Sequence, residues 1–269
     1  MTGSALAKSW ALALVLVAGI VLSLERVEGQ IDREAMGRPV VVIGSSLMLY
    51  AVPATFSEPA GLLGDGRGHA RFSVQQITEE QILALVSQAL DAGARTIFVE
   101  ANSLTFDFAH RRLPWVLRYA KALTERSYEL RRPIKWLLGY NVFASQDEPP
   151  VLDSDPVIKP EDLAAAYPLF LREPEHPLRL SKIAEEARRK GVEIVLIVPP
   201  RSETAANYMG KEAQEALQAH FEALVRKWGF SLFRTSPFWP DDYFLDHAHM
   251  NARGRARFLT EIAAWWRDR

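Results

Sequence analysis

Short apolar runs and amphipathic stretches alternate along most of this chain. Several of the apolar runs are rich in β-branched residues and too short for helices, which is typical of strands buried on both faces of a sheet. The predicted strands are residues 39–43, 96–100, 192–198 and 230–233. Elsewhere, apolar positions recur every three to four residues and predict helices. The predicted helices are residues 78–90, 113–131, 178–190 and 211–228, and one that starts at Asn251.

Local signals support this division of the chain. Thr78 and Gln81 have the spacing of a helix-capping box, in which each side chain bonds the backbone of the other residue. Residues 51–76 carry many prolines and glycines, and we expect them to be irregular. Prolines and acidic residues are frequent from residue 141 onward, so we expect an irregular insertion or surface excursion around residues 132–177.

Strands that alternate with helices predict an α/β fold, with a parallel sheet covered by helices on both faces. Ligands of such sheets bind beyond the carboxyl ends of the strands. Ser46, Asn102 and Arg201 each follow the end of a predicted strand. We therefore expect these three residues to share one rim of the sheet.

Four polar residues have the chemistry of a hydrolytic site. Asp246 lies three residues before His249, so its carboxylate can bond imidazole Nδ1 while Nε2 faces a hydroxyl. Ser46 follows a predicted strand and is the candidate nucleophile, although a serine there is also common as a turn or helix cap. Asn102 can donate its amide N–H to a developing oxyanion, or bond its own loop. Together they suggest a serine hydrolase or acyltransferase.

The same stretch is also compatible with a fragment of a metal site, because His247 lies between Asp246 and His249. A hydrolytic zinc site needs a third strong ligand. The remaining histidines show no ligand-like spacing; they are His69, His110, His176 and His220. We therefore expect neither a metal nor another cofactor.

Composition narrows the function further. A chain of 269 residues with 48% hydrophobic residues is long enough for one domain with a sizeable core. The formal net charge of −1 leaves no basic surplus for a phosphate backbone, so we expect no nucleic-acid partner. Cysteine is absent, which excludes disulfides, thiolate metal sites and a cysteine nucleophile.

The N-terminal residues predict export. Lys8 precedes an uncharged run over residues 9–24 that lacks the polar face of a core helix, and charged residues follow in 25–38. We expect residues 1–24 to be a signal-anchor whose hydrophobic helix, residues 5–24, lies in the membrane, and residues 25–38 to be a linker. The catalytic domain, residues 39–269, would then be extracytoplasmic, on the periplasmic side. The alternative is a signal peptide cleaved near Val27-Glu28-Gly29, which would release a secreted protein.

In the order and placement of its short motifs, the chain resembles the SGNH (GDSL-type) hydrolases over about residues 39–265. Val41–Ser46 is similar to the first block, Ala101-Asn102-Ser103 to the third, and Asp246 with His249 to the last. The first block departs from the family in having Ser45 where Asp is common, and the third block lacks the Gly-x-Asn-Asp form. The second block is not evident, and Gly68 is our choice for its oxyanion glycine.

The resemblance implies a three-layer, flavodoxin-like fold and ester chemistry without a cofactor. Ser46 would be the nucleophile, His249 the base, and Asp246 its orienting partner, while the Ser46 N–H, Asn102 and Gly68 would bind the oxyanion. Exported relatives suggest an esterase or O-acyltransferase acting on acyl groups, acetyl above all, of an envelope or secreted polysaccharide, alone or with a membrane acyltransferase. Arg201, Trp239 and Tyr243 are the expected substrate-binding residues.

Two alternatives remain open. One is a lipase-like or lysophospholipase-like esterase, which an anchor would hold near lipid. The other is a non-catalytic assembly protein that keeps the fold and binds polysaccharide or a membrane partner.

Overall fold

The computed structural model describes residues 35–53, 62–63, 66, 68–73, 77–107, 154–167 and 170–269. Apart from Ala35, they belong to one compact unit, formed by Met36–Pro114 and Phe143–Arg269. The expected hydrophobic helix at residues 5–24 and the helix at 113–131 lie outside the described residues. Within the described ranges, no helix is both long and apolar enough to cross a membrane.

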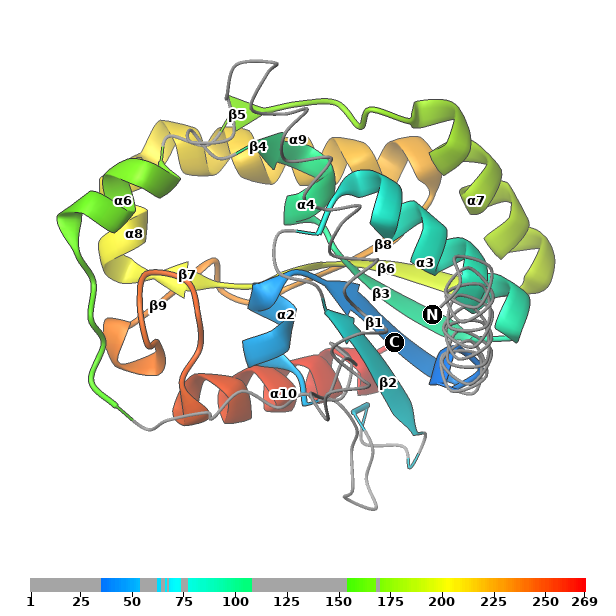
Figure 1. Cartoon of the computed structure of the whole chain (residues 1–269), viewed down its shortest axis with the longest axis horizontal. Coiled ribbons are helices and arrows are strands. Elements are labelled where there is room, and N and C mark those ends of the chain that lie inside the picture. Colours follow the sequence, from blue (N-terminus) through cyan, green and yellow to red (C-terminus); the bar gives the residue numbers. More distant parts are fainter. Residues whose placement is uncertain are drawn as a thin grey trace, which may run out of the picture. The chain divides into compact units, whose positions relative to one another are not determined.

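A parallel five-stranded sheet forms the centre of this unit (Figure 1). Its strands are β1 (Val40–Gly44), β2 (His69–Ser73), β3 (Thr96–Glu100), β6 (Glu193–Val198) and β8 (Ser231–Arg234). They lie in the order β2-β1-β3-β6-β8. Counted along the chain, this is the 2-1-3-4-5 order of flavodoxin-like, doubly wound sheets. The four strands predicted from apolar runs are confirmed, each to within one residue.

Helices cover both faces of the sheet. They are α2 (Ser46–Ala51), α3 (Glu79–Ala92), α4 (Asn102–Thr105), α6 (Pro160–Ala166), α7 (Pro177–Lys190), α8 (Glu203–Met209), α9 (Lys211–Trp228) and α10 (Ala252–Arg267), with a 3-10 turn, η2, at Asp241–Tyr243. In Figure 1, α2 and α10 lie on one side of the sheet and α3, α7 and α9 on the other. Alternation of the side chains in β1, β3, β6 and β8 explains this arrangement, because each of these strands presents apolar residues to both faces.

The two faces have separate apolar packing. Val42, Phe98 and Val195 belong to one buried cluster with Phe258 and Ile262 of α10. On the opposite face, a second set of apolar side chains surrounds a small cavity. They are Val99, Ile194 and Leu196 of the sheet, Ile82, Leu83 and Val86 of α3, Leu180 and Ile183 of α7, and Leu104 and Phe230. The three layers predicted from the sequence are therefore present.

Three helix boundaries follow from capping. Thr78 accepts a hydrogen bond from the Gln81 N–H, and the Gln81 side chain accepts one from the Thr78 N–H, so the predicted capping box is present. Gly93 ends α3 with a φ of 91°, a left-handed conformation that favours glycine. Asn251 caps α10, as predicted, by accepting from the Gly254 N–H.

Two segments expected to be irregular contain regular structure. Strand β2 lies inside residues 51–76, and its Arg71 is fully buried with its guanidinium donating to the carbonyls of Leu49 and Val52. Within residues 132–177, α6 and the short strand β5 (Phe170–Leu171) are formed, and β5 pairs with β4 (Phe106–Asp107). A second small pair joins β7 (Arg201–Ser202) to β9 (Phe238–Trp239).

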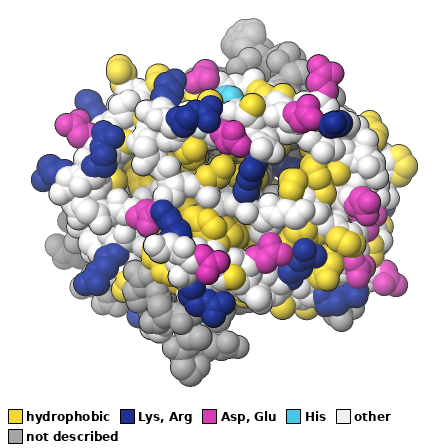
Figure 2. Space-filling view, turned by 180° about the vertical axis from the view of Figure 1, so that it is seen from behind, with side chains coloured by type: hydrophobic (Ala, Val, Ile, Leu, Met, Phe, Trp, Pro, Cys, Tyr) yellow, Lys and Arg dark blue, Asp and Glu magenta, His cyan; other side chains and the backbone are white. Residues whose placement is uncertain are grey.

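The surface carries charges of both signs. On the face shown in Figure 2, Lys and Arg side chains are interspersed with Asp and Glu, and apolar side chains lie between them. This mixture agrees with the net charge of −1.

Candidate active site

Ser46 is the first residue of α2, two positions beyond the end of β1. Ser45 caps this helix, and its hydroxyl accepts a hydrogen bond from the Leu47 N–H at 3.2 Å. Gly44 is needed before the turn, because a Cβ there would lie 2.8 Å from a carboxylate oxygen of Glu100. The first N–H groups of a helix have no intrahelical acceptor. The Ser46 N–H therefore lies where a developing negative charge would be stabilised.

His249 links the C-terminal loop to this serine. Its Nε2 lies 2.9 Å from Ser46 Oγ, and its Nδ1 lies 2.7 Å from Asp246 Oδ2. With Nδ1 protonated, the ring donates to Asp246 and Nε2 can accept the proton of the serine hydroxyl. The three side chains thus form a continuous chain of hydrogen bonds between residues 203 positions apart.

The loop holds Asp246 in the ionised state. Burial opposes ionisation of Asp246, but hydrogen bonds from the His249 ring and from the N–H groups of His249 and Ala248 outweigh it, and the pKa is lowered. Both N–H groups lie 2.8 Å from Asp246 Oδ1. An ionised Asp246 can stabilise a protonated imidazole next to it.

The base of this loop is closed by backbone pairing. The Leu245 N–H donates to the His249 carbonyl at 2.7 Å, and Phe244 forms an antiparallel bridge with Met250. Phe244 and Met250 are buried in the core cluster beside α10. The imidazole is therefore carried by a loop whose two ends are fixed in the core.

Glu100 is a buried acid next to the nucleophile. It ends β3 and is 1% exposed. Its carboxylate accepts from the Ser45 N–H at 2.7 Å and from the Ser45 hydroxyl at 2.8 Å. Burial raises the pKa of Glu100, although the bonds from Ser45 and the positive charge of Arg201 act against this rise.

Asn102 follows β3 at the position that matches Ser46. The pairing of Ile43 with Val99 places the two residues in register just beyond adjacent strands. Asn102 is 4% exposed, and its Nδ2 has no hydrogen-bond partner among the described residues. Buried donors are normally paired, so an unpaired one at this edge is suited to a group that arrives with a substrate.

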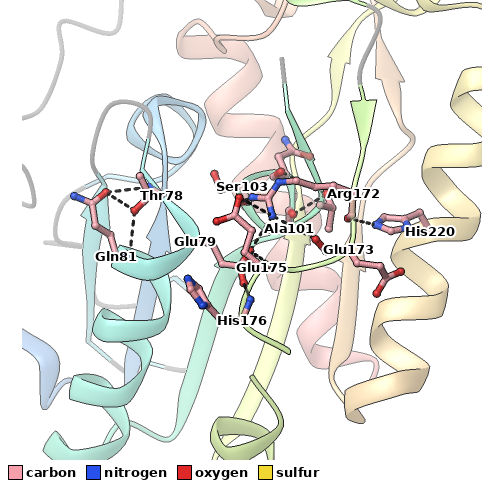
Figure 3. A network of polar contacts seen from close by, with 12 residues as sticks. Thr78, Glu79, Gln81, Ala101, Ser103, Arg172, Glu173, Glu175, His176 and His220 are labelled. Carbon is pink, nitrogen blue, oxygen red and sulfur yellow. Dashed lines mark hydrogen bonds and ion pairs between the residues drawn. The ribbon is translucent and has the colours of Figure 1, made fainter. Parts of the chain in front are cut away.

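A network of polar contacts fixes the position of the segment that carries Asn102 (Figure 3). Glu79, at the start of α3, is buried and accepts from Arg172 Nη1 at 2.9 Å and from the N–H groups of Glu175 and His176 at 2.8 Å. Arg172 also donates to the carbonyl of Ser103, the residue after Asn102, at 3.2 Å. One carboxylate therefore joins α3, the start of α7 and the Asn102 turn.

The structure brings most of the expected site residues together. Ser46, Asn102 and Arg201 lie at one edge of the sheet, as expected, with His249 beside Ser46. Arg201 is 4% exposed and donates to the Tyr167 hydroxyl at 3.0 Å.

His247, between Asp246 and His249, turns its ring toward Tyr167, at 5.8 Å between centroids. Burial lowers the His247 pKa.

The choice of Gly68 for the oxyanion hole is wrong. Gly68 immediately precedes β2, and the next residue, His69, pairs with Val40 at the start of β1. Ser46 follows the other end of β1, so the length of a strand, more than about 13 Å, separates the two positions. The residues at the correct end of β2, 74–76, lie outside the described ranges.

Trp239 does not lie on an open rim. It is 1% exposed and packs in the core cluster with Phe244 and Phe258. Tyr243 is half-buried and packs edge-on against Trp239, with the Arg257 guanidinium over its ring. The expectation for Trp239 is therefore corrected, and a substrate role for Tyr243 stays a prediction.

Sequence reasoning missed Glu100 as part of the site. The available signal was an acidic residue closing an otherwise apolar strand, two residues before Asn102.

In the described part of the chain, no group of three or more His, Asp or Glu side chains is arranged to hold a metal ion.

Comparisons with known proteins give only distant similarity. No family model and no curated protein matches this chain. Similar solved structures include a GDSL-like lipase from Bacteroides thetaiotaomicron, with 11% identity over 86% of this chain and 89% of that one and a TM-score of 0.41. Another is TesA, with 14% identity over 83% of this chain and 94% of that one and a TM-score of 0.37. Similarity at this level carries no argument about activity, which rests on the geometry of Ser46, His249 and Asp246.

Proposed function

We propose that this protein is a serine esterase or acyltransferase of the SGNH (GDSL-type) kind. The observation that carries the proposal is the hydrogen-bonded chain from Ser46 through His249 to Asp246, with distances of 2.9 and 2.7 Å. Such a chain activates a hydroxyl that is otherwise a weak nucleophile. The order of the sequence motifs described above supports the assignment to this family.

The reaction follows from these positions. His249 Nε2 takes the proton of Ser46 as Oγ bonds to the acyl carbon of an ester. The negative charge formed on the carbonyl oxygen accepts hydrogen bonds from Asn102 Nδ2 and the Ser46 N–H. His249 then returns the proton to the departing alcohol as the ester C–O bond breaks. Water or a second alcohol, deprotonated by His249, releases the acyl group and restores Ser46.

The acceptor and the location are proposed from the sequence alone. A sugar hydroxyl of an envelope or secreted polysaccharide is the proposed acceptor or leaving group, and the catalytic domain is proposed to lie outside the cytoplasm on an N-terminal anchor. The family resemblance and the apolar run at residues 9–24 support these two proposals. A partner acyltransferase in the membrane is compatible with both.

The proposed chemistry is tested by hydrolysis of p-nitrophenyl acetate. We expect Ser46→Ala to lower kcat by at least about 10³-fold, because the nucleophile is removed. Ser87→Ala, on α3, is the matched control and should retain wild-type turnover. A folded wild-type protein with no turnover would favour the non-catalytic, polysaccharide-binding alternative.

A further inference from the structure

The register of the sheet sets the order of residues along its carboxyl edge. Ile43 pairs with Val99, Glu100 with Ile197, and Val198 with Arg234. Extending these pairs beyond the strand ends brings four residues into line, in the order Ser46, Asn102, Pro199 and Thr235. Neighbouring strands are about 4.8 Å apart. Asn102 therefore lies between the nucleophile and the ends of β6 and β8.

A pocket of about 200 Å³ lies on the far side of Asn102 from Ser46, between these strand ends and α9. Asn102 itself lines it. The apolar part of its wall is formed by Val198, Pro199, Met209, Leu217, Phe221, Pro237 and Phe238, and the rest by Arg201, Lys211, Gln214, Glu215, Gln218, Arg234 and Thr235. A pocket that combines an apolar wall with a few converging polar groups is the usual form of a small-molecule site.

Asn102 supplies a polar group that needs a partner. Only 4% of the residue is exposed, and its Nδ2 has no hydrogen-bond partner among the described residues. A carbonyl oxygen held there would satisfy the donor, with its carbon on the Ser46 side. One substituent of that carbon would then extend into the pocket.

The charges at the rim of the pocket are already compensated. Lys211 lies 3.6 Å from Glu215, and Arg234 lies 3.7 Å from Glu222. Other polar side chains of the wall also make hydrogen bonds. Arg201 Nη1 donates to the Tyr167 hydroxyl, Gln214 to the Ala206 carbonyl, Gln218 to Glu222, and the Thr235 hydroxyl to the Ser236 carbonyl. A sugar ring would bury hydroxyls against the apolar residues of the wall, where they find no partner, which is costly. An apolar substituent meets no such cost.

We propose that this pocket binds the acyl chain of the ester and favours chains longer than acetyl. For scale, an apolar protein cavity of about 150 Å³ holds a benzene molecule, so this pocket has room for an acyl group of about six carbons. The proposal rests on the proposed ester chemistry and replaces the acetyl group expected from the sequence. During turnover the chain stays in the pocket while water or an alcohol attacks the acyl-Ser46 carbonyl.

The experiment compares kcat/KM for p-nitrophenyl acetate, butyrate, hexanoate and dodecanoate. Each buried methylene should raise kcat/KM about fourfold up to hexanoate, and dodecanoate should gain nothing more. Leu217→Trp should narrow the pocket and lower hexanoate turnover at least tenfold more than acetate turnover. Met209→Trp, from the opposite helix, should act in the same way and serves if the first variant does not fold.

Ala219→Trp is the matched control, because Ala219 is an exposed residue of α9 outside the pocket lining. It should keep the wild-type chain-length profile. Acetate turnover that depends on Ser46, combined with a profile that is flat or falls from acetate onward, would overturn the acyl-pocket proposal and leave the ester chemistry standing. Equal losses for all four esters in Leu217→Trp would also overturn it. No turnover of any ester by the folded wild type would overturn both proposals.

Discussion

The carboxylate of Glu100 holds Ser45, the residue before the proposed nucleophile, by bonds to both its N–H and its hydroxyl, at 2.7 and 2.8 Å. These bonds join the end of β3 to the start of α2. Ser45 in turn caps α2. The Glu100 side chain, at the end of β3, thus fixes the turn after β1 that presents Ser46.

Glu100→Gln should remove a pH dependence of stability. Burial raises the folded-state pKa of Glu100 above its unfolded value, so between the two values the folded protein binds more protons. Wild-type stability should therefore fall as pH rises from about 4.3 through the raised pKa, and Gln, which cannot ionise, should lack this decline. Urea unfolding of both proteins from pH 4 to 8 measures the difference. Parallel stability curves would contradict the prediction.

Asp246→Asn should lower kcat by about 10³–10⁴-fold, because the amide no longer fixes the His249 tautomer or stabilises its protonated form. Turnover of a p-nitrophenyl ester measures the loss. Asp242→Asn is the control, since that carboxylate is exposed and pairs with Arg253 at 3.3 Å, away from the His249 ring. Comparable losses in the two variants would argue against a specific role for Asp246.

Asn102→Ala should separate activity from stability. Loss of an oxyanion donor should lower kcat by about 10²–10³-fold. The free energy of unfolding should change by less than about 1 kcal/mol, because Nδ2 has no hydrogen-bond partner to lose among the residues that the structure describes. Asn251→Ala is the matched comparison, and it should cost about 1–2 kcal/mol by removing the cap of α10. A folded Asn102→Ala variant with wild-type kcat would exclude the oxyanion role.

Glu79→Gln should destabilise the protein by about 2–3 kcal/mol, because it removes the buried negative charge that Arg172 Nη1 contacts at 2.9 Å. Denaturant midpoints measure the change. Glu261→Gln breaks a more exposed pair with Arg257 on α10 and should cost less than about 0.5 kcal/mol. Equal losses in the free energy of unfolding for the two variants would contradict a particular role of the Glu79 network in stabilising the Asn102 turn.

Of the five strands of the central sheet, the sequence predicted the four that consist of apolar runs and missed β2, which does not. Residues 192–198 are nearly all apolar, and the strand is there. Strand β2, His69–Ser73, has buried His and Arg side chains. These polar residues hide the pattern of a buried strand. Arg71 can be buried because the carbonyls of Leu49 and Val52, which are distant in sequence, accept its hydrogen bonds.

The errors in the site have the same origin. Ser46, Asn102, Asp246 and His249 could be chosen because their chemistry and local position are readable in sequence. The error at Gly68 followed from missing β2, since the end of the sheet on which a glycine lies depends on the strand beside it. Trp239 was misplaced because burial of a large aromatic residue depends on packing against α10, which no local pattern records.

The most direct test of the account is the site of reaction with a fluorophosphonate probe. Tandem mass spectrometry of the treated protein should find one adduct, on Ser46 and not on the adjacent Ser45, and Ser46→Ala should remain unmodified. A correctly folded protein that stays unlabelled, or that carries its adduct on another serine, would contradict the assignment of Ser46 as the nucleophile.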